Sequence, residues 1–163
     1  VNMAYIRLKL WDVEYIPPGS IVDTGTLGPS VGIIIHDKQI QAAYAGHFVD
    51  ANIDGLEGMV KDALLRFQKP DYLDVYVAGN SVDDDDEDRD YFLEDREFVP
   101  ALLKKYGFLD SNTHIRWSPP STDAHLKLDV DTAENELEIL NGYGDSTRVV
   151  YRGDIRKAPN LII

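Results

Sequence analysis

Residues 31–35 read Val-Gly-Ile-Ile-Ile, and this short apolar run is the clearest indication of the central strand of the fold. The run is too short for a buried helix and is rich in β-branched residues, so it predicts a fully buried strand. Asp37 and Lys38 predict a hairpin turn, and residues 39–46 predict the returning strand. The hairpin brings the start of one strand beside the end of the other, where Ser30 and His47 can meet.

The segments that flank this hairpin show both helical and strand periodicity. Residues 6–10 alternate apolar and basic side chains, which predicts a half-buried strand. Residues 54–68 repeat apolar side chains with the helical period, and Pro70 ends that helix. A second helix is expected over residues 91–106, with a break or a late start at Pro100. The remaining strands are expected at residues 73–78, 113–117, 125–130, 136–140 and 148–152.

Two helices among many strands joined by hairpins indicate the α+β class. We expect a mixed or antiparallel β-sandwich-like core flanked by two or three helices. The 163 residues, of which 44% are hydrophobic, suit one domain over residues 1–163.

The charge balance limits the partners that this chain can have. It carries 16 basic and 29 acidic residues, a net charge of −13, which repels nucleic acids and anionic membrane surfaces. A basic patch on a protein partner would instead be attracted. Residues 83–88, Asp-Asp-Asp-Asp-Glu-Asp, predict a solvated acidic run without the spacing of an EF-hand loop, and whether it binds a cation stays open.

The composition also restricts chemistry and location. The chain has no cysteine, which removes disulfides, thiolate metal sites and cysteine nucleophiles. The other histidines, His36, His114 and His125, fall on separate segments, so we expect no metal and no cofactor. No apolar run approaches the length of a membrane span and no signal peptide pattern opens the chain, so we expect a cytoplasmic protein without membrane insertion.

Two short segments carry a family resemblance. Residues 24–32, TGTLGPSVG, resemble the "T…LGSCV" segment of CheD-type chemoreceptor glutamine deamidases, and residues 45–48, AGHF, resemble the "MAHF" segment that follows it. The helices and strands expected over roughly residues 20–140 also follow the order found in that family. It implies a CheD-like cysteine hydrolase fold and a hydrolase of chemotaxis that deamidates glutamine side chains of proteins. Ser30 would stand at the nucleophile position, His47 at the base and Thr24 at the threonine of the triad.

The chain departs from that family pattern at three places. Ser30 stands where the family has cysteine, Pro29 stands where it has serine, and residues 118–124 replace a "GGNRGR" stretch. Ser30 is therefore compatible with a serine amidase, with a natural loss of activity or with an engineered replacement. Family members also dock onto a chemotaxis phosphatase, so the alternative function is a non-catalytic CheD-like protein-binding module.

The residue types agree with amide hydrolysis independently of the family. The reaction needs a nucleophile, a base and a group that orients the base, which Ser30, His47 and Thr24 can supply. Backbone N–H groups of Gly28 and Val31 could stabilise an oxyanion, whereas Pro29 has none. The alternative interpretation is a plain turn at Ser30 and a histidine that caps backbone carbonyls at a strand end.

Overall fold

The computed structural model describes residues 3–52, 55–67, 69–142 and 147–162. Its strands form two five-stranded sheets. The first sheet has the order β1 (Ala4–Arg7), β3 (Ser20–Asp23), β8 (Thr122–Asp129), β9 (Asn135–Asn141) and β10 (Arg148–Gly153). The second sheet has the order β2 (Val13–Ile16), β5 (Ala42–Phe48), β4 (Val31–Asp37), β6 (Asp74–Gly79) and β7 (Thr113–Trp117). The helices are α1 (Leu56–Arg66), α2 (Arg89–Leu93) and α3 (Asp95–Lys105), with single turns η1 (Pro70–Tyr72), η2 (Asp110–Asn112) and η4 (Ile155–Lys157).

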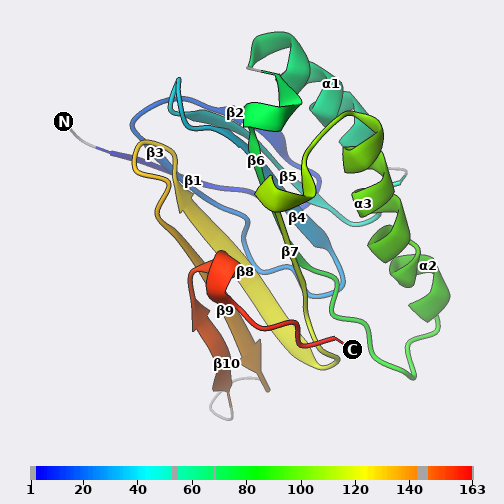
Figure 1. The fold of residues 1–163 in the computed structure, drawn as a ribbon. Coiled ribbons are helices and arrows are strands. Elements are labelled where there is room, and N and C mark those ends of the chain that lie inside the picture. Colours follow the sequence, from blue (N-terminus) through cyan, green and yellow to red (C-terminus); the bar gives the residue numbers. More distant parts are fainter. Residues whose placement is uncertain (1–2, 53–54, 68, 143–146, 163) are drawn as a thin grey trace.

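The three layers of the fold are the first sheet, the second sheet and the helices (Figure 1). Each sheet combines antiparallel pairs with one parallel pair, β1 with β3 and β6 with β7. The chain is therefore an α+β protein with a mixed, sandwich-like β core, as predicted. No helix in the described ranges is both long enough and apolar enough to cross a membrane.

Strand β4 explains why the second sheet is buried on both faces. Ile34 packs in the core between the two sheets, together with Leu126 and Leu128 of β8. Ile33 and Ile35, which point the opposite way, pack in a second core beneath α1 and α3. All seven residues of β4 are buried, as the apolar run at residues 31–35 predicts.

The β4–β5 hairpin is confirmed, although its turn is longer than predicted. The returning strand begins at Ala42 because the carboxylate of Asp37 accepts hydrogen bonds from the backbone N–H groups of Gln39 and Ile40. This local cap widens the turn before pairing starts. In the resulting register Gly32 lies opposite His47.

Several predicted boundaries are wrong. The first strand ends at Arg7 instead of residue 10, and the short strands β2 and β3 were not predicted. Pro100 lies inside α3, and the interruption comes earlier, at Glu94 between α2 and α3. Burial of Val99, Leu102 and Leu103 offsets the hydrogen bond that a proline removes. The helix α1 is confirmed, while its predicted end residues 54 and 68 lie outside the described residues.

Candidate functional site

His47 and Thr24 meet at one end of the interface between the two sheets. Thr24 directly follows β3 of the first sheet, and His47 is the second-last residue of β5 in the second sheet. The Nδ1 atom of His47 lies 2.9 Å from the backbone carbonyl oxygen of Thr24. Because a carbonyl can only accept, Nδ1 must carry the hydrogen, and in the neutral ring Nε2 is then an unprotonated acceptor.

The environment of His47 favours that neutral tautomer. Burial lowers the pKa of its ring, and the bond to Thr24 and the charges of Asp12 and Asp123 offset part of this effect. The Nε2 atom is buried and has no hydrogen-bond partner among the described residues. An unpaired acceptor in the interior is costly, so this atom is available for a proton from a nearby group or a bound molecule.

The backbone of His47 is held equally firmly. Its N–H donates to the carbonyl of Asp12 and its carbonyl accepts from the N–H of Trp11, both at 2.9 Å. Trp11 has a φ of 69°, which is rare for a bulky side chain, and 63% of its surface is exposed. The turn that contains Trp11 and Asp12 therefore fixes the end of β5 from outside the sheet.

Ser30 lies close to His47 along the hairpin but does not contact it by a hydrogen bond. Gly32 is the cross-strand partner of His47, and Ser30 is two residues before Gly32, a diagonal position on the same face. Ser30 is 5% exposed and His47 is 4% exposed, so access to both is narrow. Within the part of the chain that the structure describes, no hydrogen bond joins the two side chains.

Thr24 orients His47 through its backbone and not through its hydroxyl. The hydroxyl donates to the carbonyl of Gly25 at 2.9 Å and accepts from the N–H of Leu126 at 3.0 Å. Both bonds are buried, and the bond from Leu126 ties the residue that follows β3 to β8. Thr24 therefore contacts the ring of His47, as expected, but through its backbone carbonyl oxygen and not through its hydroxyl.

The backbone donors expected for an oxyanion are largely occupied. The N–H of Gly28 donates to the carboxylate of Asp123 at 2.8 Å, and the N–H of Ser30 donates to the carbonyl of Leu27 at 2.7 Å. Val31 is the first residue of β4 and pairs with both neighbouring strands. In this conformation the N–H of Gly28 is bonded to Asp123, so it cannot donate to an oxyanion in the way that the sequence predicts.

The loop that carries Ser30 is clamped by the end of β6. The N–H of Asn80 donates to the carbonyl of Ser30, and the N–H of Ser81 donates to the carbonyl of Gly28, both at 2.8 Å. Asn80 is fully buried with a φ of 59°, a left-handed conformation that asparagine tolerates. The only sequence signal for this clamp is the Gly-Asn pair after a strand, which marks a turn but not its partner.

Asn80 connects this clamp to the helices. Its side-chain amide donates to the carbonyl of Phe92 at 2.9 Å and its side-chain oxygen accepts from Nε of Arg96 at 2.6 Å. Arg96 also donates from Nη2 to the backbone carbonyl of Asn80 at 2.9 Å. Ser30, in the loop just before β4, is therefore connected through Asn80 to Arg96 of α3 by a chain of hydrogen bonds.

The acidic run at residues 83–88 is mostly exposed, as predicted. Asp83 accepts from the backbone N–H and the hydroxyl of Ser121, and Asp84 pairs with Arg89 at 3.6 Å. Over the described ranges, no group of three or more histidine, aspartate or glutamate side chains is arranged to hold a metal ion.

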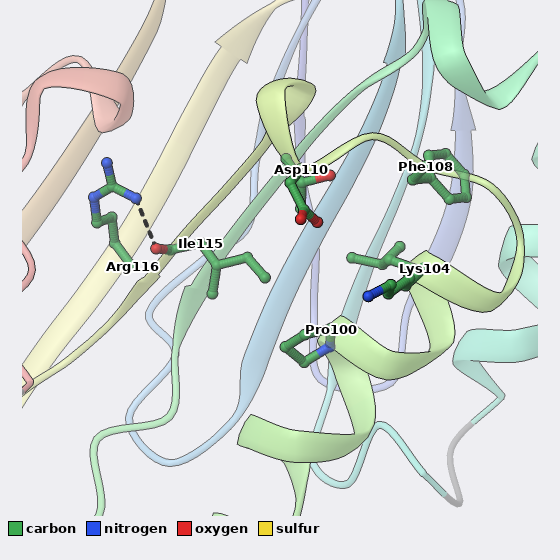
Figure 2. A pocket seen from close by; sticks show the side chains of 8 residues that line it. Pro100, Lys104, Phe108, Asp110, Ile115 and Arg116 are labelled. Atoms are coloured by element: carbon green, nitrogen blue, oxygen red, sulfur yellow. Dashed lines mark hydrogen bonds between the residues drawn. The ribbon is translucent and has the colours of Figure 1, made fainter.

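A cavity of about 200 Å³ lies elsewhere, beside α3 and β7 (Figure 2). Charged side chains of Lys104, Asp110 and Arg116 line it together with Pro100 and Ile115. Arg116 is turned aside, where Nη1 donates to the carbonyl of Ile115 at 2.8 Å. Ser30 and His47 are not among its lining residues, so this cavity is separate from the candidate site.

Comparison with known proteins gives distant likenesses. No family model and no curated protein matches the chain. Among solved structures, it is similar to the hypothetical protein YfiH of Bacillus licheniformis, with a TM-score of 0.47 and 16% identity over 64% of this chain and 49% of that chain. It is also similar to the Neisseria meningitidis DUF152 protein NMB0706, with a TM-score of 0.42 and 13% identity over 72% of this chain and 63% of that chain. The chain thus spans less than two thirds of the length of either protein.

Proposed function

We propose that this protein is a CheD-like amidohydrolase that deamidates glutamine side chains of a protein substrate. Ser30 is the nucleophile in this proposal, His47 is the base, and the backbone carbonyl of Thr24 orients the base. The observation that carries the proposal is the buried Nε2 atom of His47, which has no hydrogen-bond partner among the residues that the structure describes and whose ring is fixed by the bond from Nδ1 to Thr24. A neutral imidazole held in one tautomer is the form that a general base requires.

The proposed reaction uses His47 twice. Its Nε2 takes the proton of the Ser30 hydroxyl while Oγ attacks the amide carbon, and the protonated ring then gives that proton to the departing ammonia. A water molecule, deprotonated by the same ring, attacks the resulting ester, and the ring returns that proton to the departing Oγ of Ser30, which leaves a glutamate side chain and free Ser30. The side chain of Ser30 must first turn toward His47, as often happens when a substrate binds.

Access to the site supports a slender substrate. Ser30 and His47 are only 5% and 4% exposed, which favours a substrate that presents one extended side chain, such as that of glutamine, over a bulky molecule. The net charge of −13 attracts a substrate protein whose surface around that glutamine is basic.

The second candidate is the non-catalytic protein-binding module. It is favoured by the absence of a hydrogen bond between Ser30 and His47 in the described residues and by the occupied N–H groups of Gly28 and Ser30. A serine also depends on its base more completely than a cysteine would. In this alternative the fold is retained for docking, with the acidic residues 83–88 facing a basic partner.

Ammonia release from a basic, glutamine-bearing protein separates the two candidates. The native chain, Ser30→Cys, Ser30→Ala and His47→Gln are compared, with conversion of glutamine to glutamate followed by mass spectrometry. The proposal expects release by the native chain and none from Ser30→Ala or His47→Gln. Release by Ser30→Cys alone would indicate a disabled enzyme, and no release from either the native chain or Ser30→Cys would end the enzymatic proposal.

A further inference from the structure

A row of polar side chains crosses the outer face of the first sheet, with one residue from each strand in spatial order. These residues are Tyr5 of β1, Asp23 of β3, His125 of β8, Glu138 of β9 and Arg152 of β10, and we call them the polar ladder. The outward residues of β8 alternate with buried apolar ones, so the ladder lies opposite the core face of the sheet.

The ladder is connected along its whole length. Arg152 donates from Nε to Glu138 at 2.6 Å, and Nε2 of His125 lies 2.9 Å from the same carboxyl group. Nδ1 of His125 lies 3.6 Å from Asp23, whose other oxygen accepts a hydrogen bond from Tyr5. A carboxylate near each ring nitrogen favours the cationic form of His125, and these contacts, Asp23 first, raise its pKa.

Asp23 links this ladder to the candidate site. It is only 3% exposed, and its Oδ1 atom accepts a hydrogen bond of 2.8 Å from the backbone N–H of Gly25. Gly25 has a φ of 71°, and a Cβ there would lie 2.8 Å from the carbonyl of Leu8. The carbonyl of Thr24 and the N–H of Gly25 belong to the same planar peptide group. The bond from Gly25 to Asp23 therefore fixes the direction in which the Thr24 carbonyl points.

We propose that Asp23 is a positioning residue for His47. Asp23 holds the N–H of Gly25, the Thr24 carbonyl is thereby aimed at Nδ1 of His47, and Nε2 is left as the acceptor. The neighbours Tyr5 and His125 keep the Asp23 carboxylate in place and reduce the cost of burying it. An effect of Asp23 on catalysis rests on the proposed function, whereas its effect on the tautomer of His47 is independent of that function.

The test compares Asp23→Asn with Asp23→Ala by ¹⁵N nuclear magnetic resonance of the His47 ring, with ammonia release as a second readout. Asn keeps an oxygen that can accept from Gly25, whereas Ala has none. Arg152→Gln, at the far end of the ladder, is the matched control for general damage to the sheet. Urea unfolding of each variant establishes that it is folded before its ring is measured.

We expect the native chain, Asp23→Asn and Arg152→Gln to show one neutral tautomer of His47, protonated at Nδ1. Asp23→Ala should show loss of that single tautomer and, if the protein is a deamidase, a fall in kcat of roughly tenfold or more with little change in KM. The proposal is overturned if folded Asp23→Ala keeps the native tautomer, or if Arg152→Gln loses it to the same extent. Because the tautomer is read without substrate, a failure of deamidation leaves this result interpretable.

Discussion

The imidazole of His47 donates to the backbone carbonyl of Thr24, and this bond of 2.9 Å joins the second sheet to the first. It is buried and connects residues 23 positions apart in the chain. A carbonyl acceptor permits only one neutral tautomer, so the fold itself decides that Nε2 of His47 is the basic atom. The Ser30 loop is fixed separately, through Asn80. The β4–β5 hairpin brings Ser30 beside His47, and Thr24 joins them only when the two sheets pack together.

A methyl group added at Gly79 should disrupt the clamp on the Ser30 loop. Gly79 has a φ of 101°, and its Cβ would lie 2.3 Å from the carbonyl oxygen of Ser30. We therefore expect Gly79→Ala to lower the free energy of unfolding in urea by about 2 kcal/mol or more. Gly58→Ala in α1 is the control, because no atom of the described residues outside its own stretch of helix lies within 4 Å of its Cβ position, and it should raise that free energy by roughly 0.5–1 kcal/mol. Equal effects of the two substitutions would contradict the clamp.

The polar ladder should give the protein a pH-dependent stability centred on His125. Because the folded-state pKa of His125 is raised above its ordinary value of 6.5, chiefly by Asp23, the stabilisation is complete below pH 6.5. It is lost as the pH rises through the folded-state pKa. The difference in unfolding free energy between the native chain and His125→Gln should accordingly be largest near pH 6 and shrink at alkaline pH. A difference that is constant with pH would contradict a cationic His125.

Asp95 should make the protein less stable as the pH rises, whereas a carboxylate with a lowered pKa makes it more stable. It is fully buried, accepts from the N–H of Ala51 at 3.1 Å, and burial together with the charge of Asp50 raises its pKa to about 6. The folded state then holds its proton at a pH where the unfolded state has lost it, so stability falls as the pH rises from about 4 to about 6.

Replacement of Asp95 by Asn should remove that fall. The amide keeps an oxygen for Ala51 and places no second charge beside Asp50. We expect Asp95→Asn to gain roughly 1–2 kcal/mol over the native chain at pH 7 and little at pH 4, as measured by urea unfolding at both values. A loss of stability at pH 7 would show that the ionised carboxylate is required there.

Those parts of the fold that depend on local pattern could be predicted from the sequence. The apolar run at residues 31–35 and the helical period around Met59 specify a buried strand and an amphipathic helix without reference to distant residues. Strands β2 and β3 could not be found in this way, because each has four residues and is defined by its pairing partner. The predicted hairpin likewise places the start of β4 beside the end of β5, and in the structure Gly32 is the cross-strand partner of His47.

The finer geometry of the candidate site depends on contacts that no short pattern encodes. The Thr24 hydroxyl is taken by Leu126, 102 residues later, so the backbone carbonyl is left for His47. Asp123 accepts the hydrogen bond of the Gly28 N–H from 95 residues away. The contact between Asp23 and His125 likewise joins residues that are far apart in the sequence. Side-chain partners across two sheets are fixed by tertiary packing, which sequence spacing does not reveal.

The most direct test of the central claim is covalent labelling of Ser30 by a fluorophosphonate, read by peptide mass spectrometry. Attack by a serine oxygen forms a bond to phosphorus and expels fluoride, and it requires a base that removes the hydroxyl proton. The account predicts an adduct on Ser30 in the native chain and its loss in folded His47→Gln. A native chain that forms no adduct on Ser30, or one that His47→Gln forms equally fast, would contradict it.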